Sequence, residues 1–163
     1  MDMSGYHLSA PTAADVEALA PHVREEERLE LQHTLGVTAK SYLMMTLKGD
    51  GFGGSLVCLR HRNEALGMGG VRSHPNAPEI GIPWFIGRDL TAHRRFMVDG
   101  ARNMLRDACG GFSVLFNIVG AWNRQSIAWL RHMGFTVGKT TIPIGLARAP
   151  FYPFRAERSV FDV

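Results

Sequence analysis

The sequence contains few cysteines, and this scarcity excludes two classes of protein. Only Cys58 and Cys109 occur among 163 residues, and each lies in or beside an apolar run. A disulfide-rich secreted domain needs more cysteines, so two reduced, buried thiols are expected, and a single disulfide is the alternative. There is no Cys-x-x-Cys pair and no His/Cys cluster with metal-ligand spacing, so no metal site is predicted.

Long hydrophobic runs and runs of like charge are missing as well. No apolar segment approaches the length of a membrane span, and the N-terminus shows no signal segment, which predicts a cytoplasmic protein without a membrane partner. The formal net charge is only +3, and no basic run is long enough for a nucleic-acid arm. Nucleic acid is therefore not expected as a partner, and a solvated surface explains the charge as well as an anionic ligand does.

The composition is that of a globular domain. Apolar residues make up 45% of the chain and charged residues 20%, which is enough for a hydrophobic core. The glycines and prolines are spread along the chain, with no linker, internal repeat or low-complexity tract. A single domain is expected over residues 1–163, with its core at about residues 6–146 and an extended tail over residues 147–163.

Apolar spacing and capping residues predict a series of helices. They cover residues 12–20, 25–35, 38–48, 91–108 and 123–133. Thr12 and Asp15 have the spacing of a capping box, and Gly36 and Gly134 suit C-terminal caps.

Strands are predicted from short apolar or alternating segments between turn residues. They cover residues 6–10, 55–59, 65–71, 79–86, 112–119, 135–137 and 140–146. Pro83 lies inside one of them and indicates an edge, a bulge or a splay at that point. Helices interspersed with strands in this way predict an α/β (α+β layered) domain with a mixed sheet.

One segment carries a family resemblance. Residues 123–135 read Asn-Arg-Gln-Ser-Ile-Ala-Trp-Leu-Arg-His-Met-Gly-Phe, which resembles the N-x-x-S/A…GF segment of the GNAT acetyltransferases. The element order over residues 6–146 is also similar to the family's β-α-α-β-β-β-α-β-α-β-β. The resemblance implies a GNAT-like fold, acetyl-CoA as the cofactor, and an N-acetyltransferase acting on a primary amine of a protein or small molecule.

The resemblance also implies cofactor contacts. Asn123 would cap its helix and hydrogen-bond the cofactor arm, and Ser126, one turn later, would face the same way and is also a candidate catalytic residue. Trp84 and Phe85 lie in the strand beside which the family binds this arm, and Asn117 in the next strand is a further candidate. The alternative is that these residues serve as a helix cap, surface residues and core.

Two departures from the family pattern bear on catalysis. The family's R/Q-x-x-G-x-G/A motif corresponds here to residues 88–97, Arg-Asp-Leu-Thr-Ala-His-Arg-Arg-Phe-Met, which lack the glycine pair. Arg94 and Arg95 could bind the cofactor phosphates through their side chains instead, or they could be solvated helix residues. Leu130 stands where many members have a tyrosine that protonates the leaving thiolate.

A carboxylate or an imidazole is needed as a base. Glu79 at the start of its strand is the first candidate, and His74 is the second, because an imidazole has a suitable pKa for taking a proton from an amine. The alternative to a catalytic role is that Glu79 is an exposed charge at a strand end and that His74 is a loop residue. Glu26, Glu27 and Glu30 could line an amine pocket or form a solvated helix face.

A narrower resemblance suggests another role. Residues 83–89 (Pro-Trp-Phe-Ile-Gly-Arg-Asp), the following His-Arg-Arg-Phe and the acidic stretch at 23–31 are similar to GNAT-like proteins encoded by tailed phages. This implies, as an alternative, a non-catalytic protein with a virion-assembly or host-protein-binding role. It would act in the host cytoplasm or in the virion, with a virion or host protein as its partner.

Overall fold

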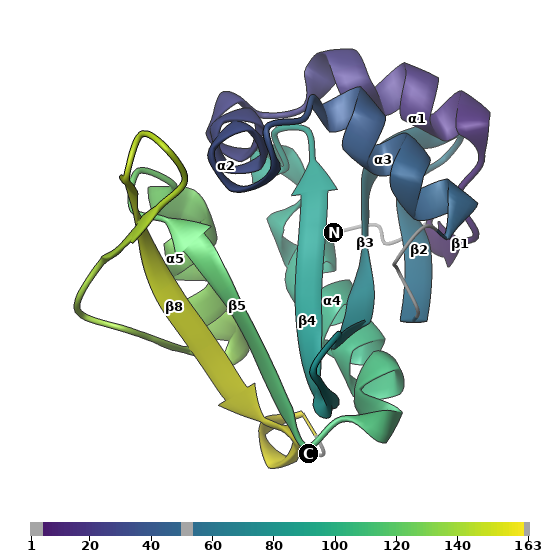
Figure 1. Ribbon diagram of the computed structural model, residues 1–163. Helices are drawn as coiled ribbons and strands as arrows, with labels where there is room; N and C mark the ends of the chain where they lie inside the picture. Colours follow the sequence, from purple (N-terminus) through teal and green to yellow (C-terminus); the bar gives the residue numbers. More distant parts are fainter. Residues whose placement is uncertain (1–4, 50–53, 162–163) are drawn as a thin grey trace.

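A mixed sheet of eight strands organises the chain in the computed structural model, which describes residues 5–49 and 54–161 (Figure 1). The strands are β1 (Tyr6–Ser9), β2 (Gly54–His61), β3 (Glu64–His74), β4 (Ala77–Gly87), β5 (Val114–Gly120), β6 (Thr136–Val137), β7 (Ile142–Ile144) and β8 (Ala149–Glu157). Their order in the sheet is β1-β2-β3-β4-β5-β8-β6, and β7 also pairs with β8. β4 and β5 form a parallel pair, whereas the other neighbouring strands are antiparallel.

Helices cover both faces of the sheet (Figure 1). The N-terminal helices are α1 (Ala13–Leu19), α2 (Glu25–Leu35) and α3 (Ala39–Lys48), which share a core with β2, β3 and β4. The later helices are α4 (Arg94–Ala108) and α5 (Arg124–Met133), which share a second core with β5 and β8. No helix of the described residues has the length and apolarity to cross a membrane.

Local sequence signals predicted these elements well. Thr12 and Asp15 form the expected capping box at the start of α1. Gly36 and Gly134 end α2 and α5 with φ of 66° and 105°, the left-handed conformation that glycine adopts without strain. Cys58 and Cys109 are free and buried, as predicted. The predicted α/β (α+β layered) domain with a mixed sheet is therefore confirmed, and the structure adds that helices cover both faces of the sheet (Figure 1).

The C-terminal tail corrects the prediction. Residues 149–157 are not a loose extension but strand β8, which pairs with β5 from Val114↔Glu157 to Gly120↔Phe151. Burial alternates within each half of this strand, with Ala149 and Phe151 buried in the first half and Phe154 and Ala156 in the second, so the buried face changes at Tyr152 and Pro153. Pro153 and Pro150 hid this pattern in the sequence, since proline cannot donate to a sheet. Their carbonyl groups nevertheless accept hydrogen bonds, from Gly138 N at 2.8 Å and Ala121 N at 3.0 Å.

Candidate functional site

The parallel strands β4 and β5 separate soon after they meet. They pair at Ile80↔Val114 and Gly81↔Leu115, and no pairing continues toward their C-terminal ends. Figure 1 shows the two strands diverging like the arms of a V. Pro83 lies at the start of this unpaired stretch and has no N–H to donate, so of the three interpretations of Pro83 the structure supports a splay. The unpaired stretch beyond Gly81 and Leu115 is called the splay below, and its open end lies at Gly87 and Gly120.

The backbone of β4 turns alternate residues toward β5. Arg88 N donates to Leu66 O of β3 at 3.0 Å, so the main-chain N–H and C=O groups of even-numbered residues in β4 point toward β3. The main-chain groups of odd-numbered residues therefore point toward the splay. Asn117 Nδ2 of β5, for example, donates to the main-chain oxygen of Pro83 across the splay at 2.8 Å. The N–H and C=O of Phe85 point the same way, between Pro83 and Gly87. This edge is suited to an extended chain with amide groups.

The side chains of Trp84 and Phe85 leave β4 on opposite faces. Trp84 packs on the N-terminal helices, with its ring 5.4 Å from that of Tyr42 in an edge-on arrangement. Phe85 packs on the α4 face, where a Cβ at Gly67 would lie 2.3 Å from the Phe85 ring. Both rings are half-buried, so the structure gives each a packing role beside the splay.

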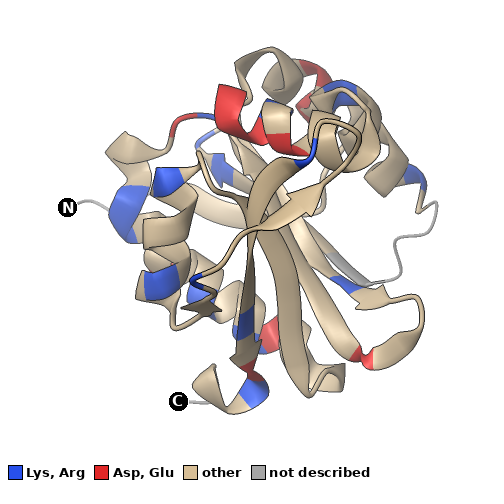
Figure 2. Cartoon of the chain, turned by 60° about the vertical axis from the view of Figure 1, so that its left-hand side comes forward, with Lys and Arg blue, Asp and Glu red and all other residues tan. Residues whose placement is uncertain are grey.

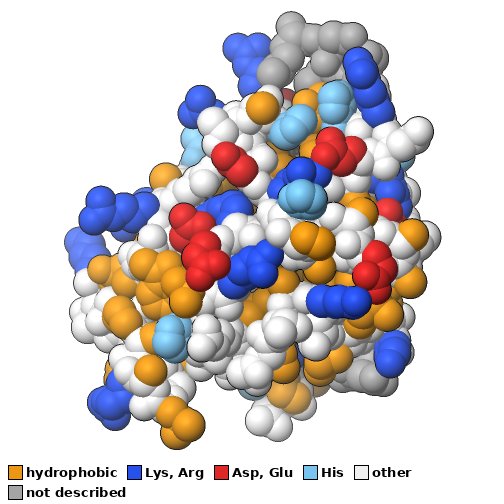
Figure 3. Space-filling model, turned by 90° about the horizontal axis from the view of Figure 1, so that it is seen from above, with side chains coloured by type: hydrophobic (Ala, Val, Ile, Leu, Met, Phe, Trp, Pro, Cys, Tyr) orange, Lys and Arg blue, Asp and Glu red, His pale blue; other side chains and the backbone are white. Residues whose placement is uncertain are grey.

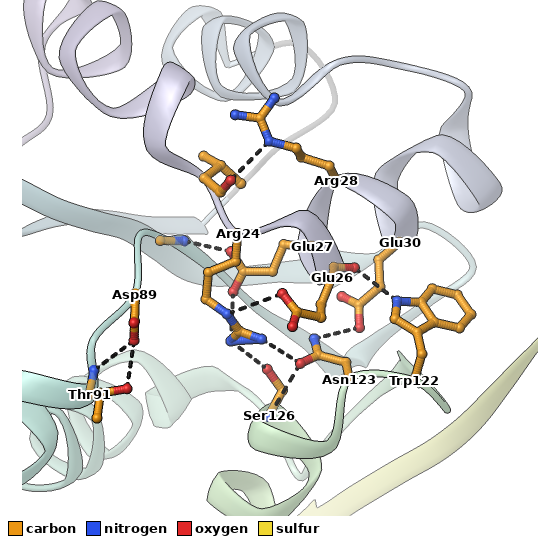
Figure 4. Close-up of polar contacts among 12 residues, drawn as sticks. Arg24, Glu26, Glu27, Arg28, Glu30, Asp89, Thr91, Trp122, Asn123 and Ser126 are labelled. Atoms are coloured by element: carbon orange, nitrogen blue, oxygen red, sulfur yellow. Dashed lines mark hydrogen bonds and ion pairs between the residues drawn. The ribbon is translucent and has the colours of Figure 1, made fainter.

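The start of α5 lies at the open end of the splay. Asn123 directly precedes this helix and is 1% exposed, and its Oδ1 accepts from Ser126 N at 3.3 Å as an N-cap. Its carboxamide also bonds α2 and the residue before this helix: Arg24 Nη2 donates to the same Oδ1 at 2.6 Å, and Nδ2 donates to Glu30 Oε1 at 2.9 Å (Figure 4). Ser126 Oγ lies 3.5 Å from Arg24 Nη1. The structure thus brings Asn123 and Ser126 together, and both side chains contact Arg24.

Helix α2 supplies the residues that the sequence interpretation undervalued. Glu27 Oε2 accepts from Gly87 N, and Glu30 Oε1 accepts from Gly120 N, each at 2.9 Å. Arg24 directly precedes the helix and shares its face with these two carboxylates, because residues three apart are neighbours on a helix. Glu27 is 6% exposed, so the alternative of a solvated helix face is wrong for this residue. The i, i+3 spacing of Glu27 and Glu30 was the available signal, whereas nothing in the local pattern distinguished Arg24.

Burial shifts the pKa of both carboxyl groups upward. It raises the pKa of Glu27 to about 8, against the opposing effects of the Gly87 hydrogen bond and the Arg24 charge. Burial also raises the pKa of Glu30, although hydrogen bonds from Asn123 and Gly120 oppose the shift. Glu27 therefore carries a proton in most molecules at neutral pH, and it changes protonation state close to the pKa range useful for proton transfer.

Charges of both signs meet at this end of the molecule. Figure 2 shows acidic residues gathered at α2, near the top of the view. Seen from above, acidic and basic side chains lie next to one another rather than in one large patch of a single sign (Figure 3). Arg24, for example, lies 3.7 Å from both Glu26 and Glu27.

The turn between β4 and α4 holds the predicted phosphate contacts. Asp89 accepts from Thr91 N at 3.0 Å and from Thr91 Oγ1 at 2.6 Å, and these hydrogen bonds lower the pKa of the Asp89 carboxyl group. Arg94 and Arg95 open α4 and are exposed. Neither is held in the core, so both side chains can reach an anion in solution.

Glu79 and His74 lie at the other end of β4. Glu79 is exposed, and its main-chain carbonyl accepts from Ser113 N at 2.9 Å where β4 and β5 still run together. His74 ends β3, and its Nδ1 accepts from Asn76 N at 3.1 Å in the hairpin turn. Gly87 is eight residues beyond Glu79, which is about 26 Å along a strand. The structure does not bring these two residues together with Asn123 and Ser126.

Sequence comparison finds no match among protein-family models or curated proteins. Solved structures, in contrast, match almost the whole chain. A "probable acetyltransferase" of the GNAT family from Chromobacterium violaceum superposes with a TM-score of 0.71 at 18% identity, over 99% of this chain and 92% of that one. The spermidine N-acetyltransferase from Vibrio cholerae, in complex with CoA and spermine, gives 0.69 at 9% identity, over 97% and 98%. YncA from Salmonella typhimurium, with its cofactor acetyl-CoA, gives 0.66 at 16% identity, over 95% of each chain.

These identities are too low to carry an activity across, but the overlap is nearly complete in both directions. The splayed parallel pair, the capped helix after β5 and the helices on both faces all lie within the superposed region. The chain therefore has the fold of the GNAT acetyltransferases.

Proposed function

We propose that the protein is an acetyl-CoA-dependent N-acetyltransferase acting on a primary amine of a protein or small molecule. The observation that carries this proposal is the splay, where β4 presents the main chain of Phe85 to β5 without a pairing strand. An extended ligand arm with amide groups can hydrogen-bond such an edge as an added strand would.

The residues around the splay fit this ligand. The Phe85 N–H and C=O can bond an amide of the arm, and Trp84 and Phe85 give the strand an apolar surround. Arg94, Arg95 and the start of α4 supply positive charge for phosphate groups in place of a glycine cradle. When bound, acetyl-CoA supplies the thioester carbonyl carbon that an amine nitrogen attacks.

Glu27 is a better candidate for the base than Glu79 or His74. It reaches the open end of the splay from α2, beside Asn123 and its partners, whereas the other two lie at the far end of β4. The ionised form of Glu27, whose population grows as the pH rises toward 8, would take the proton that the amine loses as the new C–N bond forms and the C–S bond breaks. The thiolate leaving group then takes a proton from solvent.

Calorimetric titration with acetyl-CoA tests the proposal. We expect micromolar binding by the wild type and about tenfold weaker binding by the Arg94→Ala/Arg95→Ala variant, because two charge-assisted phosphate contacts are removed. Asn123→Ala should also weaken binding, and its melting temperature must be measured alongside, since the lost cap costs about 1 kcal/mol. Arg131→Ala, exposed in the last turn of α5, is the matched control and should bind like the wild type.

Absence of binding and of any thermal shift at millimolar acetyl-CoA would contradict the proposal, because a ligand of the folded state stabilises it by mass action. If binding is found, polyamines are the first acceptors to assay. The spermidine N-acetyltransferase among the similar structures was solved with spermine. Peptides with a free N-terminus or lysine form the second set.

A non-catalytic binding role is the second candidate function. It is favoured by the open end of the splay, where the Gly87 and Gly120 N–H groups already have partners in Glu27 and Glu30. This alternative, a GNAT-like protein that binds a virion or host protein, predicts a stable complex in infected-cell extract and no response to acetyl-CoA. Recovery of the protein as a lone monomer would count against it.

A further inference from the structure

One face of α2 spans the open end of the splay. Arg24, Glu27 and Glu30 follow each other at three-residue intervals. The Glu27 and Glu30 carboxylates bond the ends of β4 and β5, and the Arg24 side chain points toward Asn123 and Ser126 (Figure 4). The side chains of Arg24 and Glu27 are only 12% and 7% exposed. Burying charged groups to this extent is unfavourable unless they have partners, so the arrangement needs a structural or functional reason.

This face holds both strand ends where the sheet itself does not. At β4, Gly87 N donates to Glu27 Oε2 at 2.9 Å, and Arg24 N donates to Gly87 O at 3.2 Å. At β5, Gly120 N donates to Glu30 Oε1 at 2.9 Å. Because β4 and β5 are not paired here, these bonds tie both strand ends to the same helix.

The same face fixes the orientation of Asn123. A guanidinium group only donates and a carboxylate only accepts, so Oδ1 must face Arg24 and Nδ2 must face Glu30. With Ser126 N also bonded to Oδ1, the oxygen has both acceptor positions filled. The second hydrogen of Nδ2 can bond only an acceptor such as a carbonyl oxygen, and not an N–H.

We propose that Arg24 and Glu30 are positioning residues of the cofactor site, which set the width of the splay at its open end and the orientation of Asn123. This inference rests on the proposed binding of acetyl-CoA. Glu30 Oε1 alone accepts from both Gly120 and Asn123, so the requirement at this position is an oxygen acceptor rather than a negative charge. Arg24 differs, because it must reach Asn123 and Ser126 with two donors of a planar group.

The test exploits this difference between the two residues. In acetyl-CoA titrations, Glu30→Ala should raise Kd at least tenfold, and Glu30→Gln should stay within about threefold of the wild type, because glutamine keeps an acceptor oxygen. Arg24→Lys should lose about as much affinity as Arg24→Ala, because one ammonium group cannot replace the fork. Glu25→Ala, exposed on the same helix, is the matched control. Unfolding midpoints identify any variant that loses affinity by unfolding.

A second measurement needs no ligand. Amide hydrogen exchange at Gly120 should accelerate at least tenfold in Glu30→Ala and remain close to the wild-type rate in Glu30→Gln. If the wild type binds acetyl-CoA but Glu30→Ala and Arg24→Ala bind equally well, the inference is overturned and the proposed function stands. Tighter binding by these variants also overturns it, since α2 would then compete with the ligand. If the wild type does not bind, the proposed function fails and the inference with it, whatever the exchange rates.

Discussion

The Arg60–Asp15 pair and the Arg24–Glu27 pair both have side chains with little solvent exposure, yet the pKa values of their carboxyl groups shift in opposite directions. Asp15 is bonded through both oxygens to the Arg60 guanidinium, and it also accepts from Thr12 N at 2.7 Å and Thr12 Oγ1 at 2.9 Å. The hydrogen bond from Arg60 is the main cause of a lowered pKa of Asp15, and the bonds from Thr12 contribute. Glu27 has only the Gly87 N–H and a guanidinium nitrogen at 3.7 Å, and burial raises its pKa to about 8.

The difference follows from the stronger desolvation of Glu27 and from how each arginine distributes its donors. Arg60 gives two of its nitrogens to Asp15 and its Nε to Ser9 Oγ at 2.6 Å, so it ties β1, α1 and β2 together. Arg24 gives its shortest hydrogen bond to Asn123, and Glu27 is left short of donors. Burial therefore accompanies a structural ion pair in one place and a carboxyl group with a raised pKa in the other.

The largest expected effect is on catalysis. Glu27→Gln should lower kcat/KM by about 10²–10⁴-fold, which is the usual contribution of a general base, and the folded state should be retained because the amide oxygen still accepts from Gly87. Initial rates with acetyl-CoA and a primary amine measure this. Glu79→Gln serves as the matched control and should change the rate little. A larger loss of kcat/KM in Glu79→Gln than in Glu27→Gln would indicate that Glu79, at the far end of β4, is the base.

The next effect is on stability. Asp15→Ala should lower the free energy of unfolding by about 3–5 kcal/mol, because it leaves the Arg60 charge buried without its partner and removes the capping box of α1. Urea denaturation measures the loss. Glu17→Ala, on the same helix but in an exposed pair with Lys40, should cost at most about 1 kcal/mol. Equal losses in the two variants would show that the Asp15 pair has no special role.

The pH dependence of stability separates the two carboxyl groups further. Folded Glu27 keeps its proton up to about pH 8, whereas the unfolded chain releases it near 4.5, so the folded state binds more protons between these values. Stability should therefore fall as the pH rises from 5 to 8, by about 3–4 kcal/mol more in the wild type than in Glu27→Gln. Asp15 acts in the opposite direction: its pKa is lowered, so its contribution is lost as the pH falls below about 3.8. Parallel unfolding curves for the wild type and Glu27→Gln across pH 5–8 would contradict the raised pKa.

Much of the fold could be predicted because its signals are local. The bounds of α2 at Glu25–Leu35 and the capping box at Thr12 depend on interactions between residues three or four positions apart, so a short stretch of sequence contains the whole signal. β8 was missed for a related reason. Its prolines disrupt the local strand signal, and its assignment depends on pairing with β5, some forty residues earlier.

The site was predicted only in part. Asn123 and Ser126 were identified from a linear motif, and the structure places both at the open end of the splay. Arg24, 99 positions before Asn123, had no motif to mark it. Glu79 and His74 had suitable chemistry, but Glu79 lies near the start of β4 and His74 at the end of β3, so both are at the opposite end of β4 from Gly87.

The sequence alone was sufficient for the helices and their caps, most of the strands, the buried free thiols and the GNAT-like order of elements. These depend on hydrophobic period and on hydrogen bonds within a single turn, which neighbouring residues specify. Tertiary packing was needed to distinguish Glu27 from Glu26, two adjacent carboxylates in one acidic run. The Glu27 side chain packs against the end of β4 and is desolvated, whereas the Glu26 side chain remains 46% exposed. Desolvation is what raises the pKa of a carboxyl group toward neutrality.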